Sequence, residues 1–303
     1  MMNSLQKYCQ KELAKQKFDC LAVGAFDLNS AEIFFFELTK NKSYLNTSPI
    51  YFDLASLTKP LTLGVLYLEN EKIFDEEMLL LLEHRAGLPA HGRLAKSEWR
   101  DFISSYAIKA TTTTYSDFSA LRLMLELEKK LGVNLKKRCE TYWDQELLYW
   151  KDLSPGKNCA VTGLRGGREI TAVVHDDNAF VLDEFVVHAG LFATVEGLCK
   201  TLININKKLN LQKKILDVLA TKKEGRFVRG WDIATGETSL AGPGFVGPTI
   251  GHLGFTGTSL WIDLKSGKGY ALLTNYTQYA NYERMALNKL RREVGSFIWN
   301  NFT

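Results

Sequence analysis

The sequence predicts an α+β protein whose single antiparallel sheet is assembled from both ends of the chain. Residues 20–26 and 32–38 are apolar, strand-like runs joined by a polar turn, which is typical of a hairpin. A second hairpin is predicted from residues 258–263 and 270–275. The segments between them are mostly helical, so we expect a helical domain inserted into a sheet domain, with the terminal helices covering the sheet.

Periodicity and stop signals give the expected boundaries. The sheet domain is expected at residues 1–60 and 186–303, and the inserted, mainly helical domain at residues 61–185. Apolar residues at helical spacing predict a set of helices. These are expected at residues 1–18, 78–84, 99–106, 117–131, 195–208 and 281–302. One further strand is predicted at residues 169–174, inside the insertion.

The composition is that of an ordinary globular protein. Hydrophobic residues make up 46% of the 303 residues, charged residues 24%, and the net charge is only +4. Short, scattered lysine patches favour solvated helix faces over a surface for nucleic acid or lipid. The five cysteines lack C-x-x-C spacing, which favours free thiols in a reducing compartment.

The N-terminal segment is polar and amphipathic. It lacks the apolar core of a secretory signal or a membrane span. We therefore expect a cytoplasmic protein, or a periplasmic one if a leader has been removed from this sequence.

Ser56 and Lys59 are the first candidates for chemistry. Side chains three residues apart on a helix share one face, about 5–6 Å apart at their β-carbons. The apolar run from Leu61 to Leu68 predicts that this helix continues into the core. A lysine deprived of water beside a serine is one route to an activated nucleophile. A helix start with a serine cap fits the same spacing, so this motif alone leaves both interpretations open.

Tyr115 precedes the predicted helix at residues 117–131. A phenol beside two cations loses its proton well below its usual pKa near 10, and the phenolate is then a base for a serine hydroxyl. The alternative is a simple helix start, in which Ser116 or Asp117 is the cap and Tyr115 packs half-buried.

The run from Gly251 to Thr258 holds three glycines, at positions 251, 254 and 257. Glycine lets backbone N–H groups approach a substrate closely. The amides of Ser56 and Phe255 are therefore candidates for the donors of an oxyanion hole. In other enzymes, removal of one such donor costs about 2.7–4 kcal/mol of transition-state stabilisation. The alternative is a glycine-rich start of a strand with a structural His252.

In order and spacing, these three stretches resemble the serine β-lactamase and penicillin-binding-protein superfamily, in its class C-like and esterase-like branch. The superfamily motifs are Ser-x-x-Lys, Tyr-x-Asn and Lys/His-x-Gly. They correspond here to Ser56 with Lys59, Tyr115 with Asp117, and His252 with Gly254. Further phrases at residues 81–89, 174–179 and 188–194 also resemble this branch. The likeness covers most of residues 52–275.

The resemblance implies a β-lactamase/transpeptidase-like fold, with the serine helix between the sheet and the helical insertion. It also implies roles for individual residues. Ser56 would be the acylated nucleophile, Lys59 and Tyr115 the shared general base, the Ser56 and Phe255 amides the oxyanion donors, and Asp117, His252 and Gly254 substrate-binding or supporting residues. An acyl-enzyme would form and then be hydrolysed, with no cofactor or metal.

Asp117 and Leu253 depart from the family pattern. Asp117 stands where asparagine is usual, and its charge should raise the pKa of Lys59, which favours Tyr115 as the base. It would also repel a substrate that carries an amide carbonyl or a carboxylate at that position. Leu253 lacks the hydroxyl with which penicillin-recognising relatives bind that carboxylate. Replacement anchors are Arg165, Arg168 or a C-terminal arginine.

The cluster formed by His175, Asp176 and Asp177 invites a metal hypothesis. It lacks a second ligand pair at suitable spacing, so loop capping is the better interpretation. The role of this region stays open.

The leading hypothesis is a serine hydrolase that cleaves a small ester or amide, with a cell-wall recycling fragment as one candidate. One alternative is a penicillin-recognising D,D-carboxypeptidase or β-lactamase. Another is a non-catalytic binding protein on the same fold, which a Lys59 amine held by Asp117 and remote from Ser56 would favour. A small molecule is the expected partner, and the oligomeric state is open.

Overall fold

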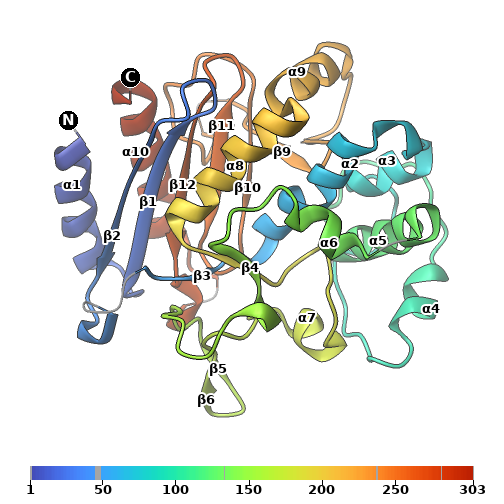
Figure 1. Cartoon of the computed structure of the whole chain (residues 1–303), viewed down its shortest axis with the longest axis horizontal. Coiled ribbons are helices and arrows are strands. Elements are labelled where there is room, and N and C mark those ends of the chain that lie inside the picture. The colour runs from blue at the N-terminus through green and yellow to red at the C-terminus, as the bar shows by residue number, and fades with distance from the viewer. Residues whose placement is uncertain (1, 45–48, 133, 237, 281, 303) are drawn as a thin grey trace.

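A seven-stranded antiparallel sheet joins the two ends of the chain, in the strand order β2-β1-β12-β11-β10-β9-β8 (Figure 1). The computed structural model describes residues 2–44, 49–132, 134–236, 238–280 and 282–302. The strands of this sheet are β1 (Cys20–Asp27), β2 (Ile33–Thr39), β8 (Phe227–Val228), β9 (Trp231–Ile233), β10 (Thr249–Leu253), β11 (Ser259–Asp263) and β12 (Lys268–Thr274). Both predicted hairpins, β1-β2 and β11-β12, are confirmed.

Helices cover both faces of this sheet (Figure 1). The terminal helices α1 (Met2–Lys15) and α10 (Met285–Asn301) share a core with one face, which includes Leu21, Val23 and Ala25 of β1. The alternate side chains of β1 face α8 (Val195–Leu209), as the two-residue period of a strand requires. A β-carbon on Gly24 would lie 2.6 Å from the Cys199 sulfur, so this glycine permits the close approach of α8.

The predicted insertion consists mainly of short helices. They are α2 (Val65–Glu69), α3 (Glu76–Leu82), α4 (Trp99–Ser104), α5 (Asp117–Leu131), α6 (Leu135–Glu140) and α7 (Asp177–Leu182). The hydroxyl of Ser116 caps α5 by accepting the amide of Ser119 at 2.9 Å, and Gly132 ends the helix at a φ of 56°. Division of the chain after residues 60 and 185 stays a prediction.

Smaller elements complete the structure. Helix α9 (Leu211–Thr221) follows α8. A three-stranded sheet has the order β3-β7-β4, from Phe52–Asp53, Leu191–Ala193 and Leu147–Tyr149. The predicted strand at residues 169–174 is wrong. The chain instead forms the hairpin of β5 (Leu164–Arg165) and β6 (Arg168–Glu169), and Ala172 has a φ of 54°, which is incompatible with a continuous strand.

The segment after Ser56 is buried, as predicted, but it is not one regular helix. A 3₁₀ turn covers Ala55–Leu57, a π-helical turn covers Pro60–Gly64, and α2 follows. Pro60 has no N–H to donate, which favours a change of pitch at this point. Every residue from 57 to 68 is buried, so the segment forms a core between the sheet and the helical part.

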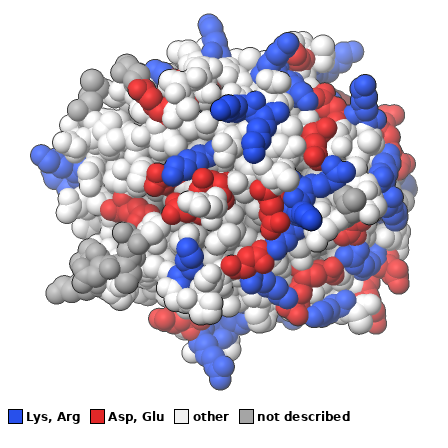
Figure 2. Space-filling view, viewed as in Figure 1, with Lys and Arg blue, Asp and Glu red and all other residues white. Residues whose placement is uncertain are grey.

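Charged side chains of both signs are interspersed over the helical part of the face shown in Figure 2. Within the described ranges, no helix combines the length and apolar character needed to cross a bilayer.

Candidate active site

Ser56 lines a cleft of about 1370 Å³ and lies on the turn that follows β3. Tyr115, Asp117, His252 and Phe255 also line this cleft. The residue before the serine, Ala55, has a left-handed φ of 46°. Such a conformation is strained for alanine and is common where a backbone presents a functional group.

Lys59 is the central cation of the site. Its side chain is only 2% exposed, and its Nζ donates to Ser56 Oγ at 3.0 Å and to the His188 carbonyl oxygen at 3.2 Å. The same nitrogen lies 2.7 Å from Asp117 Oδ1. Two hydrogen bonds and an ion pair with a carboxylate are the contacts expected of a charged lysine.

The electrostatics agree with this geometry. Burial lowers the pKa of Lys59, but the charge of Asp117, followed by interactions with Tyr115, outweighs that effect and raises the pKa above its ordinary value. The prediction that Asp117 holds Lys59 protonated is therefore confirmed.

Tyr115 contacts the same pair of side chains. Lys59 Nζ lies 4.9 Å from the centre of its ring, and hydrogen bonds with Lys59 and Ser56 lower the pKa of the phenol. Desolvation raises the pKa of the phenol and is the largest effect, even though Tyr115 is 36% exposed. Together with the charge of Asp117, it outweighs the effects of Lys59 and Ser56, so the pKa of Tyr115 is raised. The expectation of a lowered pKa is wrong, because burial and Asp117 outweigh the cation.

Two threonines attach the 254–258 turn to the backbone before Ser56. Thr256 Oγ1 donates to the Asp53 carbonyl at 2.7 Å, and Thr258 Oγ1 donates to the Leu54 carbonyl at 3.1 Å. A β-carbon on Gly254 would lie 1.9 Å from Thr258 Oγ1 and 2.6 Å from the Leu54 oxygen. Glycine is therefore required at this position for the turn to approach the serine.

The amides of Ser56 and Phe255 have no acceptor among the described residues. Arg284 Nη2 donates to the Phe255 carbonyl at 2.7 Å, and the guanidinium lies over the Phe255 ring at 4.8 Å. These contacts fix the Phe255 peptide at the cleft, where its N–H remains available to a ligand.

His252 is a buried histidine that lines the cleft. It is 3% exposed, and its Nδ1 lies 2.9 Å from the Leu253 carbonyl oxygen. Burial, with a smaller effect from Lys59, lowers the pKa of His252 to about 3. A histidine that stays uncharged at neutral pH adds no second positive charge beside Lys59.

Sequence reasoning missed the aromatic neighbours of Tyr115. The ring of His84 lies 4.6 Å from that of Tyr115, and the ring of Phe227 lies 5.8 Å away. Burial lowers the pKa of His84 to about 3. His84 falls within the family-like phrase at residues 81–89, which was the available signal, whereas Phe227 lies in a short strand that carries none.

The segment from His175 to Asp177 caps a helix, as predicted from the sequence. Asp176 caps α7 by accepting the Ala179 amide at 2.8 Å, and it also lies 3.1 Å from His188 Nε2. Asp177 pairs with Arg165 at 3.0 Å. Within the described ranges, no three side chains of metal-binding type gather at one point.

The candidate carboxylate anchors are distributed unequally. Arg165 and Arg284 line the cleft, whereas the exposed Arg168 lies on β6 and does not. Leu253 lines the cleft as well.

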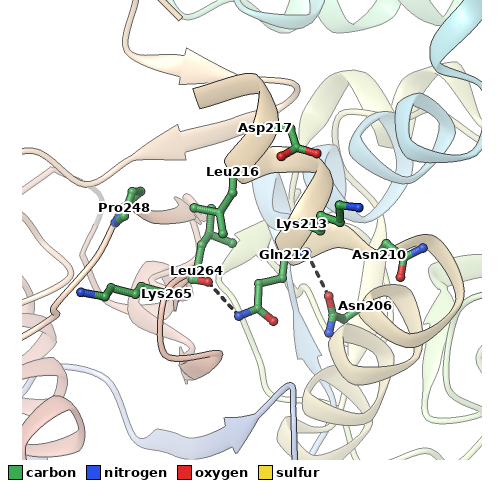
Figure 3. Close-up of a pocket in the computed structure, with 9 residues that line it drawn as sticks. All are labelled: Asn206, Asn210, Gln212, Lys213, Leu216, Asp217, Pro248, Leu264 and Lys265. Atoms are coloured by element: carbon green, nitrogen blue, oxygen red, sulfur yellow. Dashed lines mark hydrogen bonds between the residues drawn. The ribbon is translucent and has the colours of Figure 1, made fainter. Parts of the chain in front are cut away.

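A second hollow, of about 600 Å³, lies between α8, α9 and the end of β11 (Figure 3). Two of its polar residues, Gln212 and Asn206, are bonded within the protein. The side-chain Nε2 of Gln212 donates to the Leu264 carbonyl at 2.8 Å, and the backbone N–H of Gln212 donates to Asn206 Oδ1 at 2.9 Å. No candidate site residue lines this hollow.

Solved structures with the same architecture include β-lactamases. A class C β-lactamase from Rhodobacter sphaeroides matches with a TM-score of 0.69 at 15% identity, over 97% of this chain and 98% of that one. A β-lactamase from Mycobacterium bovis matches with a TM-score of 0.63 at 16% identity, over 97% and 98%. SurE matches with a TM-score of 0.68 at 15% identity, over 97% of this chain and 76% of its own. These matches define a β-lactamase/transpeptidase-like fold.

The family model of the β-lactamases matches residues 78–293. The chain belongs to the β-lactamase family, whose members are normally serine hydrolases. Tyr115, Asp117, His252 and Phe255 fall inside the matched range, whereas Ser56 and Lys59 precede it. No curated protein is similar enough in sequence to match the chain.

Proposed function

We propose that this protein is a serine hydrolase in which a small ester or amide acylates Ser56. The observation that supports this most directly is the buried Lys59 ammonium, 3.0 Å from Ser56 Oγ and 2.7 Å from Asp117. A buried cation beside a hydroxyl that faces a cleft is costly, and such arrangements are concentrated at catalytic sites.

The resting site holds its protons on Lys59 and Tyr115, so acylation needs a proton relay. Acylation requires the fraction of molecules in which Lys59 has lost one proton to solvent, and the neutral amine then accepts the Ser56 proton as Oγ bonds to the carbonyl carbon. Tyr115 donates its proton to the leaving group and regains one from Lys59. Water then hydrolyses the acyl-enzyme by the reverse sequence of transfers.

The developing oxyanion is stabilised on the opposite side of Ser56. The amides of Ser56 and Phe255 are the proposed donors, and removal of one such donor typically costs about 2.7–4 kcal/mol of transition-state stabilisation. Because Thr256 and Thr258 already fix the turn, little reorganisation is needed when the charge forms.

The substrate is an ester or amide without a carboxylate beside the scissile bond. The charge of Asp117 disfavours such a carboxylate, and Leu253 offers no hydroxyl to bind one. SurE has been solved with D-Leu, so D-amino-acid esters and amides belong among the compounds tested, together with cell-wall fragments.

A second candidate is a penicillin-recognising D,D-carboxypeptidase or β-lactamase. Arg165 and Arg284 line the cleft and favour this activity, because either guanidinium can bind a carboxylate. The non-catalytic alternative has less support, since Lys59 contacts Ser56 as well as Asp117.

The deciding experiment compares hydrolysis of nitrophenyl acetate, D-alanine nitroanilide and nitrocefin by the wild type and by Ser56→Ala. We expect turnover of the ester or the amide, none by the variant, and no nitrocefin hydrolysis. Rapid Ser56-dependent nitrocefin hydrolysis favours the second candidate. Equal turnover by wild type and variant refutes the proposal.

A further inference from the structure

Asp53 is a buried carboxylate that the proton relay does not use. It is 1% exposed, its Oδ1 accepts the Ala55 amide at 2.8 Å, and its Oδ2 accepts the His175 amide at 2.7 Å. No lysine or arginine of the described chain pairs with it within 4.0 Å. Burial raises the pKa of Asp53 to about 7, against the effect of the two backbone donors. A costly buried carboxyl with two backbone partners calls for a functional reason.

The first contact acts on the nucleophile. Ala55 has a φ of 46°, a conformation that costs on the order of 1–3 kcal/mol for a residue other than glycine. The bond from its amide to Asp53 offsets that cost and fixes the direction in which the next residue, Ser56, leaves the turn.

The second contact acts on the His175 loop, which reaches Lys59 through His188. His175 is followed by Asp176, whose Oδ1 lies 3.1 Å from His188 Nε2, and the His188 carbonyl accepts from Lys59 Nζ at 3.2 Å. The Asp53 carboxylate therefore joins the serine turn to the His175–Asp176 segment, which in turn contacts His188, the residue whose carbonyl accepts from the ammonium.

The third contact comes from the backbone of the same residue. The Asp53 carbonyl accepts Thr256 Oγ1 at 2.7 Å, so the turn that carries the Phe255 amide is fixed to Asp53 as well. The serine turn, the His175 segment 122 residues further on and the Thr256 turn 203 residues further on all meet at this one residue.

We infer that Asp53 is the positioning residue of the site, which holds the Ser56 turn, the His175 loop and the Phe255 turn in one arrangement. This inference rests on the proposed function, in which Ser56 is the nucleophile. Asp53 touches neither substrate nor reacting atoms, because it acts through Ala55, His175 and Thr256. A displacement of about 1 Å in such a site lowers the rate by about 10²-fold.

Asp263 is a matched control within the same chain. It is also 1% exposed, and its carboxylate also accepts backbone amides, from Lys265 at 2.9 Å and from Val246 at 2.7 Å. Those partners belong to turns at the far end of β11, and none of them lines the cleft. Replacement of either carboxylate by an amide removes one acceptor from a buried backbone donor, so the costs in stability are comparable.

The test compares Asp53→Asn, Asp263→Asn and the double variant Asp53→Asn with Ala55→Gly. The measurements are the rate of Ser56 acylation by a fluorophosphonate, kcat and KM for nitrophenyl acetate, thermal unfolding, and hydrogen exchange of peptides spanning residues 54–58. We expect Asp53→Asn to lower the acylation rate and kcat by about 10²-fold with little change in KM, and to speed exchange at residues 54–58. Asp263→Asn should leave the acylation rate unchanged.

Glycine at position 55 adopts a positive φ without strain, so the double variant should recover part of the lost rate. The inference is overturned if Asp53→Asn acylates at the wild-type rate, if Asp263→Asn loses as much, or if the double variant recovers nothing. If the wild type is not acylated at all, the proposed function fails instead. Hydrogen exchange then decides alone: faster exchange only in Asp53→Asn supports the positioning role, and unchanged exchange refutes it.

Discussion

The two sides of Ser56 are built from different kinds of groups. On the lysine side, the side chains of Lys59, Asp117 and Tyr115 interact directly, and burial and charge shift the pKa values of Lys59 and Tyr115. On the side of the proposed oxyanion hole, the groups are backbone amides, which do not titrate, on a turn that the Thr256 hydroxyl fixes to the Asp53 carbonyl. Changes on the lysine side should therefore be severe and pH-dependent, whereas changes on the oxyanion side should be milder and independent of pH.

Removal of the central cation should have the largest effect. Lys59→Met should lower the rate of Ser56 acylation by about 10⁴-fold, because the relay loses the group that exchanges protons with Ser56. Single-turnover kinetics with nitrophenyl acetate measure this rate. Lys222→Met is the matched control, because Lys222 is 9% exposed and pairs with Glu83 at 2.6 Å, outside the cleft. A comparable loss of acylation rate in both variants would show that Lys59 has no special role in acylation.

The phenol of Tyr115 should rank next. Tyr115→Phe keeps the ring contacts with His84 and Phe227 but removes the proton donor, so kcat should fall by about 10²- to 10⁴-fold while the melting temperature stays constant. The loss should be smaller for nitrophenyl esters, whose leaving group needs no proton, than for amides. An equal loss for both substrates would contradict the assignment of Tyr115 as the proton donor.

Asp117→Asn should change the pH profile more than the maximal rate. The charge of Asp117 is the largest of the effects that raise the pKa of Lys59. Because asparagine is neutral, the pKa of Lys59 should fall in this variant. The neutral amine then forms at lower pH, and the rising limb of the plot of kcat/KM against pH should move to lower pH. The profile of the same variant in nitrophenyl acetate hydrolysis checks this shift. An unmoved limb would show that Asp117 does not control the charge of Lys59.

On the oxyanion side, Thr256→Val should have the smallest effect. Loss of the hydroxyl bond to the Asp53 carbonyl loosens the turn, and kcat should fall by about 10-fold at every pH. Thr256→Ser restores the hydroxyl and should restore the rate. A pH-dependent loss, or a serine variant as slow as valine, would remove the distinction between the two sides.

The sequence predicted what depends on local periodicity and short motifs. Both hairpins, the helix at residues 117–131 with its Ser116 cap, and the buried run after Ser56 follow from patterns within a single segment. The sign of the Tyr115 shift did not, because it depends on desolvation by groups from distant segments. The contacts of Asp53 with His175 and Thr256 were hidden for the same reason, since they join segments far apart in the sequence.

The most direct test of the account is the mass of the intact protein after incubation with a fluorophosphonate, followed by peptide mapping. The proposed nucleophile predicts a single adduct on Ser56 in the wild type and none in Ser56→Ala. An unmodified wild type, or an adduct that forms equally in the variant, would contradict the account.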